Sequence, residues 1–159
     1  MTIKQLLSLS TDQLQEEYVL TLGGAVYYFS LAEWMAANCC EIMQNGYVRD
    51  VCTKSKKITA WNIAEKLVSL SGKLSKSDEQ HCLVTAAAEF QILVSDARNP
   101  LLHAYPAAVD DIAVLHNPKD QQTFSLSALE DIATRSFNCE NVLNHAYYNY
   151  LIPKFSNGG

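Results

Sequence analysis

Apolar side chains recur every three or four residues over a long stretch near the start of this chain. Residues at that spacing lie on one face of an α-helix, so the pattern predicts a long amphipathic helix. Thr11 and Asp12 supply capping groups before it, and Asn45 with Gly46 forms a stop signal after it. The apolar positions are Val19, Leu22, Val26, Phe29, Ala36, Cys40 and Met43.

Three further helices are expected, and each follows a hydroxyl side chain that can cap it. Thr59 precedes a short helix that ends near Ser71. Ser77 opens a second helix, in which apolar residues again recur at helical spacing. Ser127 precedes the last helix, which we expect to cover about 128–151.

The order of these segments predicts an all-α fold, a bundle of about four main helices. Segment 47–58 is expected to be a loop because it is polar and basic, with Lys54, Lys56 and Lys57 among its charges. Segment 105–124 is expected to be a long loop with at most a short helical turn, because it holds two prolines and few periodic apolar positions. We expect residues 1–159 to form a single helical domain, with an ordered core over about 11–151.

Charge and cysteine content narrow the classes of function. The net charge of −5 excludes a strongly basic surface that would bind nucleic acid through its overall field. No stretch offers the roughly 18 uninterrupted apolar residues of a membrane span, and no signal peptide is recognisable, so we expect a cytoplasmic protein without a membrane partner. The five cysteines include no CxxC spacing. We expect reduced thiols, no metal ion and no cofactor.

Residues 95–105, "SDARNPLLHAY", interrupt the apolar pattern with groups that can do chemistry. On an unbroken helix, Arg98 and His103 would point about 140° apart. Pro100 disfavours helix at the preceding residue, and Asn99 suits an N-cap. We therefore expect a kink at this point that turns Arg98 and His103 into one groove.

The order Arg98-Asn99, then "PLL", then His103 resembles the R-x4–6-H motif of the HEPN superfamily of helical nucleases, which has a polar residue after the arginine. The order of helices is similar to the HEPN bundle over most of residues 11–151. This resemblance implies a metal-independent endoribonuclease, in which the RNA 2′-hydroxyl attacks the adjacent phosphate. Histidine suits the proton transfer and arginine suits the phosphate oxygens.

The resemblance also implies the roles of individual residues and partners. Arg98 and His103 would be catalytic, and Asn99 would orient one of them. Because one motif carries one histidine, a homodimer would bring two copies together. The substrate would be RNA, in a toxin–antitoxin or phage-defence system, with an antitoxin or regulatory protein as a further partner.

Glu33 lies at helical spacing among the apolar residues of the first helix. A buried carboxylate needs a partner, and Arg98 is the natural candidate, which would make Glu33 a group that positions the arginine. An exposed place at the edge of the apolar stripe is the alternative.

Two other functions remain open from the sequence. Residues 98–103 can be structural, in which case the protein is a catalytically inactive HEPN-like interaction or scaffold module. A small-molecule binding bundle, with a cleft near Cys139, His145 and the tyrosines of "YYNY", is a more remote alternative.

Overall fold

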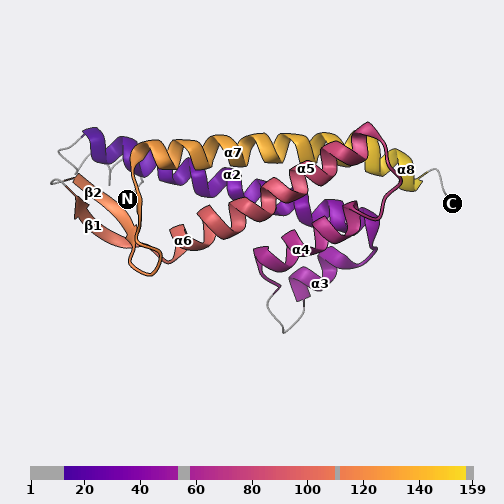
Figure 1. Cartoon of the computed structure of the whole chain (residues 1–159), viewed down its shortest axis with the longest axis horizontal. Helices are drawn as coiled ribbons and strands as arrows, with labels where there is room; N and C mark the ends of the chain where they lie inside the picture. The colour runs from indigo at the N-terminus through magenta and orange to yellow at the C-terminus, as the bar shows by residue number, and fades with distance from the viewer. Residues whose placement is uncertain (1–12, 54–57, 110–111, 157–159) are drawn as a thin grey trace.

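The computed structural model describes residues 13–53, 58–109 and 112–156. Helices dominate these residues, so the all-α prediction is confirmed, with a small sheet added at one end (Figure 1). In chain order the elements are α2 (Gln13–Met43), α3 (Tyr47–Thr53), α4 (Ala60–Ser71), α5 (Asp78–Ile92), the π-helical turn η1 (Leu93–Arg98), α6 (Asn99–Leu102), β1 (Tyr105–Val109), β2 (Ile112–Asn117), β3 (Gln122–Phe124), α7 (Leu126–Ala146), the π-helical turn η2 (Tyr147–Leu151) and α8 (Ile152–Ser156).

The two long helices α2 and α7 lie side by side along the long axis of the molecule (Figure 1). Two contacts show that they run parallel. The Tyr28 ring packs on Phe137, and further along both helices the Cys39 thiol donates to the carbonyl of Leu143. Helix α5 packs against α7 and α2, and α4 packs against α5 and α2. These four helices correspond to the four main helices that the sequence predicts.

Local capping explains where the helices begin and end. The Thr59 side chain accepts from the N–H of Asn62, and the Thr59 N–H donates to the Asn62 side chain in return, which forms a capping box at the expected cap of α4. Ser77 caps α5 as expected, but Ser125 rather than Ser127 caps α7. After α2 the chain turns at Gly46, where a φ of 87° favours glycine. The expected helix start at Thr11 and Asp12 lies outside the described residues.

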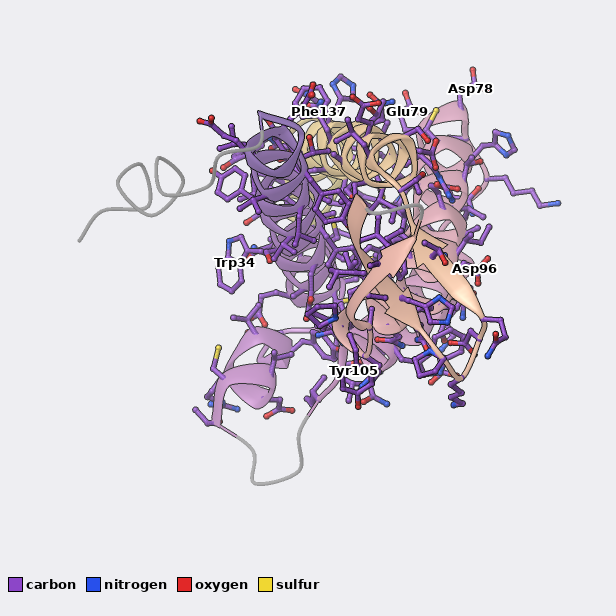
Figure 2. The ribbon with its side chains drawn as sticks, turned by 90° about the vertical axis from the view of Figure 1, so that its left-hand side faces the viewer. Trp34, Asp78, Glu79, Asp96, Tyr105 and Phe137 are labelled. Atoms are coloured by element: carbon purple, nitrogen blue, oxygen red, sulfur yellow. The ribbon has the colours of Figure 1, made fainter. Side chains whose placement is uncertain are left out.

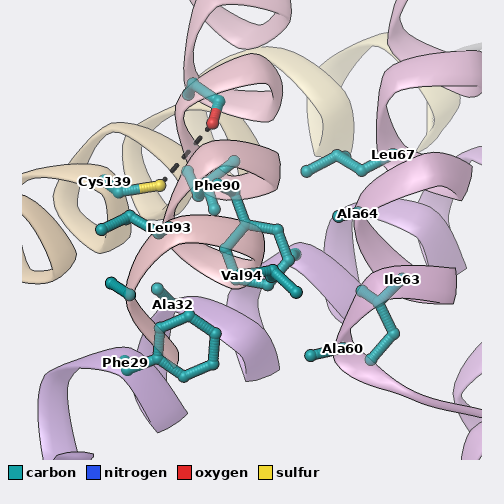
Figure 3. Packing of buried hydrophobic residues seen from close by; sticks show 14 of the residues in the cluster. Phe29, Ala32, Ala60, Ile63, Ala64, Leu67, Phe90, Leu93, Val94 and Cys139 are labelled. Carbon is teal, nitrogen blue, oxygen red and sulfur yellow. Dashed lines mark hydrogen bonds between the residues drawn. The ribbon is translucent and has the colours of Figure 1, made fainter. Parts of the chain in front are cut away.

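Small and aromatic side chains share the core. The rings of Phe29 on α2 and Phe90 on α5 stack with their centroids 5.7 Å apart (Figure 3). Ala32, Ala60 and Ala64 are buried beside them, and their short side chains let three helices approach closely. This core fixes α2 against the segment that leads into the Arg98 motif.

Two segments that the sequence predicts as loops contain regular structure. Residues 47–53 form α3, because the Glu41 carboxylate accepts from the N–H groups of Gly46 and Val48 at the start of that helix, at 2.8 and 2.7 Å. Lys54, Lys56 and Lys57, which follow in the same segment, lie outside the described residues. In the described part of the chain, no helix is both long and apolar enough to span a membrane.

The prediction of a loop over 105–124 is wrong. This segment forms a three-stranded antiparallel sheet in the order β1-β2-β3. The Tyr18 hydroxyl on α2 donates to the carbonyl of Phe124 at 2.7 Å and accepts from the N–H of Leu115 at 2.8 Å. One side chain of the long helix therefore holds β2 and β3 together.

Candidate functional site

The motif segment remains helical where a break is expected. Asn99 has φ −66° and ψ −46°, and its side chain caps nothing, so the expectation of an N-cap at Asn99 is wrong. The reason lies in the preceding turn: η1 is π-helical, and the N–H of Asn99 already bonds to the carbonyl of Val94. A π-helical turn of this kind shifts the hydrogen-bond register just ahead of Pro100, which lacks an N–H.

Arg98 is half-buried, and its neighbour holds its guanidinium. Nη1 donates to Oδ1 of Asn99 at 2.9 Å, so Asn99 orients the arginine. Arg98 lines a cavity of about 190 Å³ between α2, α6 and α7. The lining residues are Ala25, Val26, Phe29, Ser30, Glu33, Arg98, Leu101, Leu102 and Ile132.

Glu33 lines the same cavity, which brings it into the electrostatic field of Arg98. Burial raises the pKa of the Glu33 carboxyl, and the positive charge of Arg98 offsets part of that rise. Among the described residues, neither a hydrogen bond nor an ion pair joins the two side chains. The carboxylate and the guanidinium are therefore neighbours that both keep free hydrogen-bonding capacity toward the cavity.

His103 is placed differently from Arg98. It ends α6 with φ −105° and ψ 9°, its backbone N–H bonds to the carbonyl of Pro100, and its side chain is exposed. The imidazole does not line the cavity of Arg98 and has no hydrogen-bond partner among the described residues. The structure thus brings together Arg98, Asn99 and Glu33 but leaves His103 outside their cavity within one chain.

Asn117 is a supporting residue that the sequence analysis missed. Its side chain is 2% exposed and donates to the carbonyl of Pro100 at 3.0 Å, which ties β2 to the motif helix. It also accepts from the N–H of Lys119 and donates to the Asp120 carboxylate. The sequence Asn-Pro-Lys-Asp is a turn signal that could have identified this hairpin.

A second hollow surface lies between α5 and α7, where the sequence suggests a small-molecule cleft. It consists of two adjoining hollows of about 530 and 550 Å³ that share Cys82 and Val142. Cys139 lines the first, whereas His145 and Tyr150 line the second. Among the described residues, no group of three or more His, Cys, Asp or Glu side chains is arranged to hold a metal ion.

An ion pair between α5 and α7 lies at the first of these hollows. Nε and Nη2 of Arg135 on α7 both lie 2.8 Å from Oε1 of Glu89 on α5. Because each partner satisfies the other, these two charges have less capacity left for a ligand than Glu33 and Arg98 do. The cavity beside Arg98 is therefore the stronger candidate site.

In comparisons with known proteins, no family model, no curated protein and no solved structure matches this chain.

Proposed function

We propose that this protein is a metal-independent endoribonuclease of the HEPN type, with Arg98 and His103 as its catalytic residues. The observation that carries the proposal is the state of Arg98: Asn99 holds its guanidinium, Arg98 lines a cavity, and among the described residues no other hydrogen bond to its side chain forms. A guanidinium oriented in this way suits two phosphate oxygens. The motif also ends a long helical run in a helical bundle, as the resemblance implies.

The proposed reaction needs one nucleophile from the substrate and two proton transfers. The 2′-oxygen of RNA attacks the adjacent phosphorus, the bond from phosphorus to the 5′-oxygen breaks, and a 2′,3′-cyclic phosphate and a 5′-hydroxyl form. A neutral His103 accepts the 2′-hydroxyl proton, and a protonated histidine supplies one to the 5′-oxygen. Arg98 stabilises the negative charge that develops on the phosphate oxygens.

A second copy of the chain would supply the second histidine. The surface around His103 suits an interface, since its neighbour Tyr105 is 67% exposed. Trp34, which is 52% exposed, projects from α2 at the left of Figure 2, while Tyr105 lies on strand β1 toward the bottom of the view. Burial of such side chains against a symmetry-related copy would remove apolar surface from water and bring two His103 side chains together.

Cleavage of single-stranded RNA by purified variants tests the catalytic residues. Arg98→Ala and His103→Ala are each expected to lower the rate at least 100-fold, with fold and self-association unchanged. His81→Ala, which removes an exposed histidine from the first turn of α5, is the matched control and should cleave at the wild-type rate. Unchanged cleavage by His103→Ala would refute the assignment.

Mixing experiments test the shared site. Wild type and His103→Ala are mixed in equal amounts and their subunits are allowed to exchange. If both His103 side chains serve one reaction, only the wild-type homodimers cleave, so the mixture has about a quarter of the activity of wild type at the same total concentration. If each chain acts alone, the mixture retains about half.

The proposed biological role is an RNase of a toxin–antitoxin or phage-defence system, controlled by an antitoxin or regulatory protein. The second candidate function is a catalytically inactive interaction module. The position of His103 outside the Arg98 cavity favours it, because an isolated chain then has no complete catalytic pair. The two candidates differ in one result: the interaction module cleaves no RNA under any condition but still binds its partner through the exposed apolar side chains.

A further inference from the structure

The cavity beside Arg98 has the size of a binding site for one ring system. A closed apolar cavity of about 150 Å³ takes up benzene, whereas pockets for drug-sized ligands hold about 300–1,000 Å³. The cavity of about 190 Å³ lies between these cases and opens to solvent past Val26 and Leu102, both exposed. A single nucleobase can therefore enter, while its sugar and phosphate stay outside.

The cavity walls suit a flat aromatic ligand. Phe29, Leu101 and Ile132 are buried and form an apolar floor, and Val26 and Leu102 stand at the mouth. Single-stranded RNA is recognised largely by bases that leave the stack, pack on apolar or aromatic side chains and form hydrogen bonds along the Watson–Crick edge. The apolar part of the cavity supplies the first contact.

The polar groups decide which base fits. An ionised carboxylate only accepts hydrogen bonds, and neither oxygen of Glu33 accepts one from any described residue. Guanine alone among the four RNA bases presents two adjacent donors on its Watson–Crick edge, the N1–H and the 2-amino group, which match the two oxygens of one carboxylate. Adenine and cytosine present one amino donor beside an acceptor, and uracil presents one donor between two acceptors.

We propose that the cavity between α2, α6 and α7 binds a guanine base of the RNA, with the Glu33 carboxylate accepting from the guanine N1–H and 2-amino group. Arg98 at the cavity wall then reaches the phosphate attached to that nucleotide. The inference rests on the proposed function, because it assigns the base specificity of the same site. It also gives Glu33 a purpose, since a half-buried carboxylate without a bonded partner costs stability.

Binding of free nucleotides tests the proposal without any need for cleavage. Guanosine 5′-monophosphate is titrated into the protein and followed by calorimetry, with adenosine and inosine 5′-monophosphate as competitors. We expect the guanine nucleotide to bind roughly 5- to 150-fold more tightly than the adenine nucleotide, as for one two-point base contact. Inosine lacks the 2-amino group and should bind with intermediate affinity.

Variants connect the preference to the cavity. Glu33→Gln should lose the discrimination between guanine and adenine nucleotides, while Glu65→Gln, an exposed carboxyl on α4, should keep it. Val26→Phe, which fills the mouth and leaves both charges intact, should weaken binding of the guanine nucleotide. Thermal melting of each variant shows that the fold is retained.

The possible outcomes separate this inference from the proposed function. Equal affinity for guanine and adenine nucleotides, or no binding because a side chain of a second copy fills the cavity, overturns the guanine site even if RNA is cleaved. Guanine-selective binding that Glu33→Gln abolishes supports the site. If this binding occurs without RNA cleavage, the guanine site stands and the ribonuclease proposal fails.

Discussion

Replacement of Tyr18 by phenylalanine removes one oxygen atom and, with it, two long-range hydrogen bonds. The buried Tyr18 hydroxyl joins the carbonyl of Phe124 and the N–H of Leu115, which lie on neighbouring strands. Each such bond contributes about 0.5–1.5 kcal/mol net, so the loss should be about 1–3 kcal/mol. The ring itself stays, and therefore packing changes little.

Thermal and chemical denaturation measure this effect. In a chain of 159 residues, a loss of that size lowers Tm by roughly 2–12 °C. Tyr27→Phe is the matched control, because the Tyr27 side chain is 60% exposed and its hydroxyl has no hydrogen bond among the described residues. The control should change stability by less than about 0.5 kcal/mol. Equal effects of the two substitutions would refute the role of Tyr18 as the link between helix and sheet.

Three further predictions concern the core, the candidate site and the thiols. Phe90→Ala, which removes a fully buried ring that stacks on a second phenylalanine, should lower the free energy of unfolding by about 3–5 kcal/mol in urea titrations, and a loss under 1 kcal/mol would contradict the packing. The pKa of Glu33 is raised in the folded state, so the native protein holds that proton more tightly than the unfolded chain and loses stability as pH rises through the raised pKa. Glu33→Gln should therefore gain Tm relative to wild type as the pH rises above the range in which an ordinary glutamate titrates, and a constant difference would argue against this effect. A thiol reagent near pH 8 should label the exposed Cys52 and Cys82 quickly and the three buried cysteines slowly. Burial raises the pKa of Cys139 to about 12, and it also raises the pKa of Cys39 and Cys40. Five equal labelling rates, measured by mass spectrometry, would contradict this burial.

Helices were predictable here because their signals are local. The stop at Gly46 and the caps at Thr59 and Ser77 each depend on neighbours within four residues. The strands were missed because β1 reads Tyr-Pro-Ala-Ala-Val, in which proline and two alanines hide the usual preference for large branched residues. What stabilises the sheet is a long-range contact with Tyr18, which no local pattern records.

The same contrast between local signals and long-range contacts applies to the candidate site. The position of Glu33 among the apolar residues of the first helix left two places open, beside Arg98 or at the exposed edge of the stripe, and the structure has both residues lining one cavity. The place of His103 was not predictable, since it depends on the π-helical turn before Pro100, which keeps the segment helical. Asn117 was missed because its importance comes from burial against the motif helix.

The chemistry of the cleavage products tests the central proposal most directly. Purified wild type and His103→Ala are incubated with mixed-sequence single-stranded RNA in EDTA, and the 3′ ends of the products are analysed. The proposal predicts cleavage by the wild type alone, with 2′,3′-cyclic phosphate at the new ends. Equal and negligible cleavage by both proteins, or products that end in a 3′-hydroxyl, would contradict it.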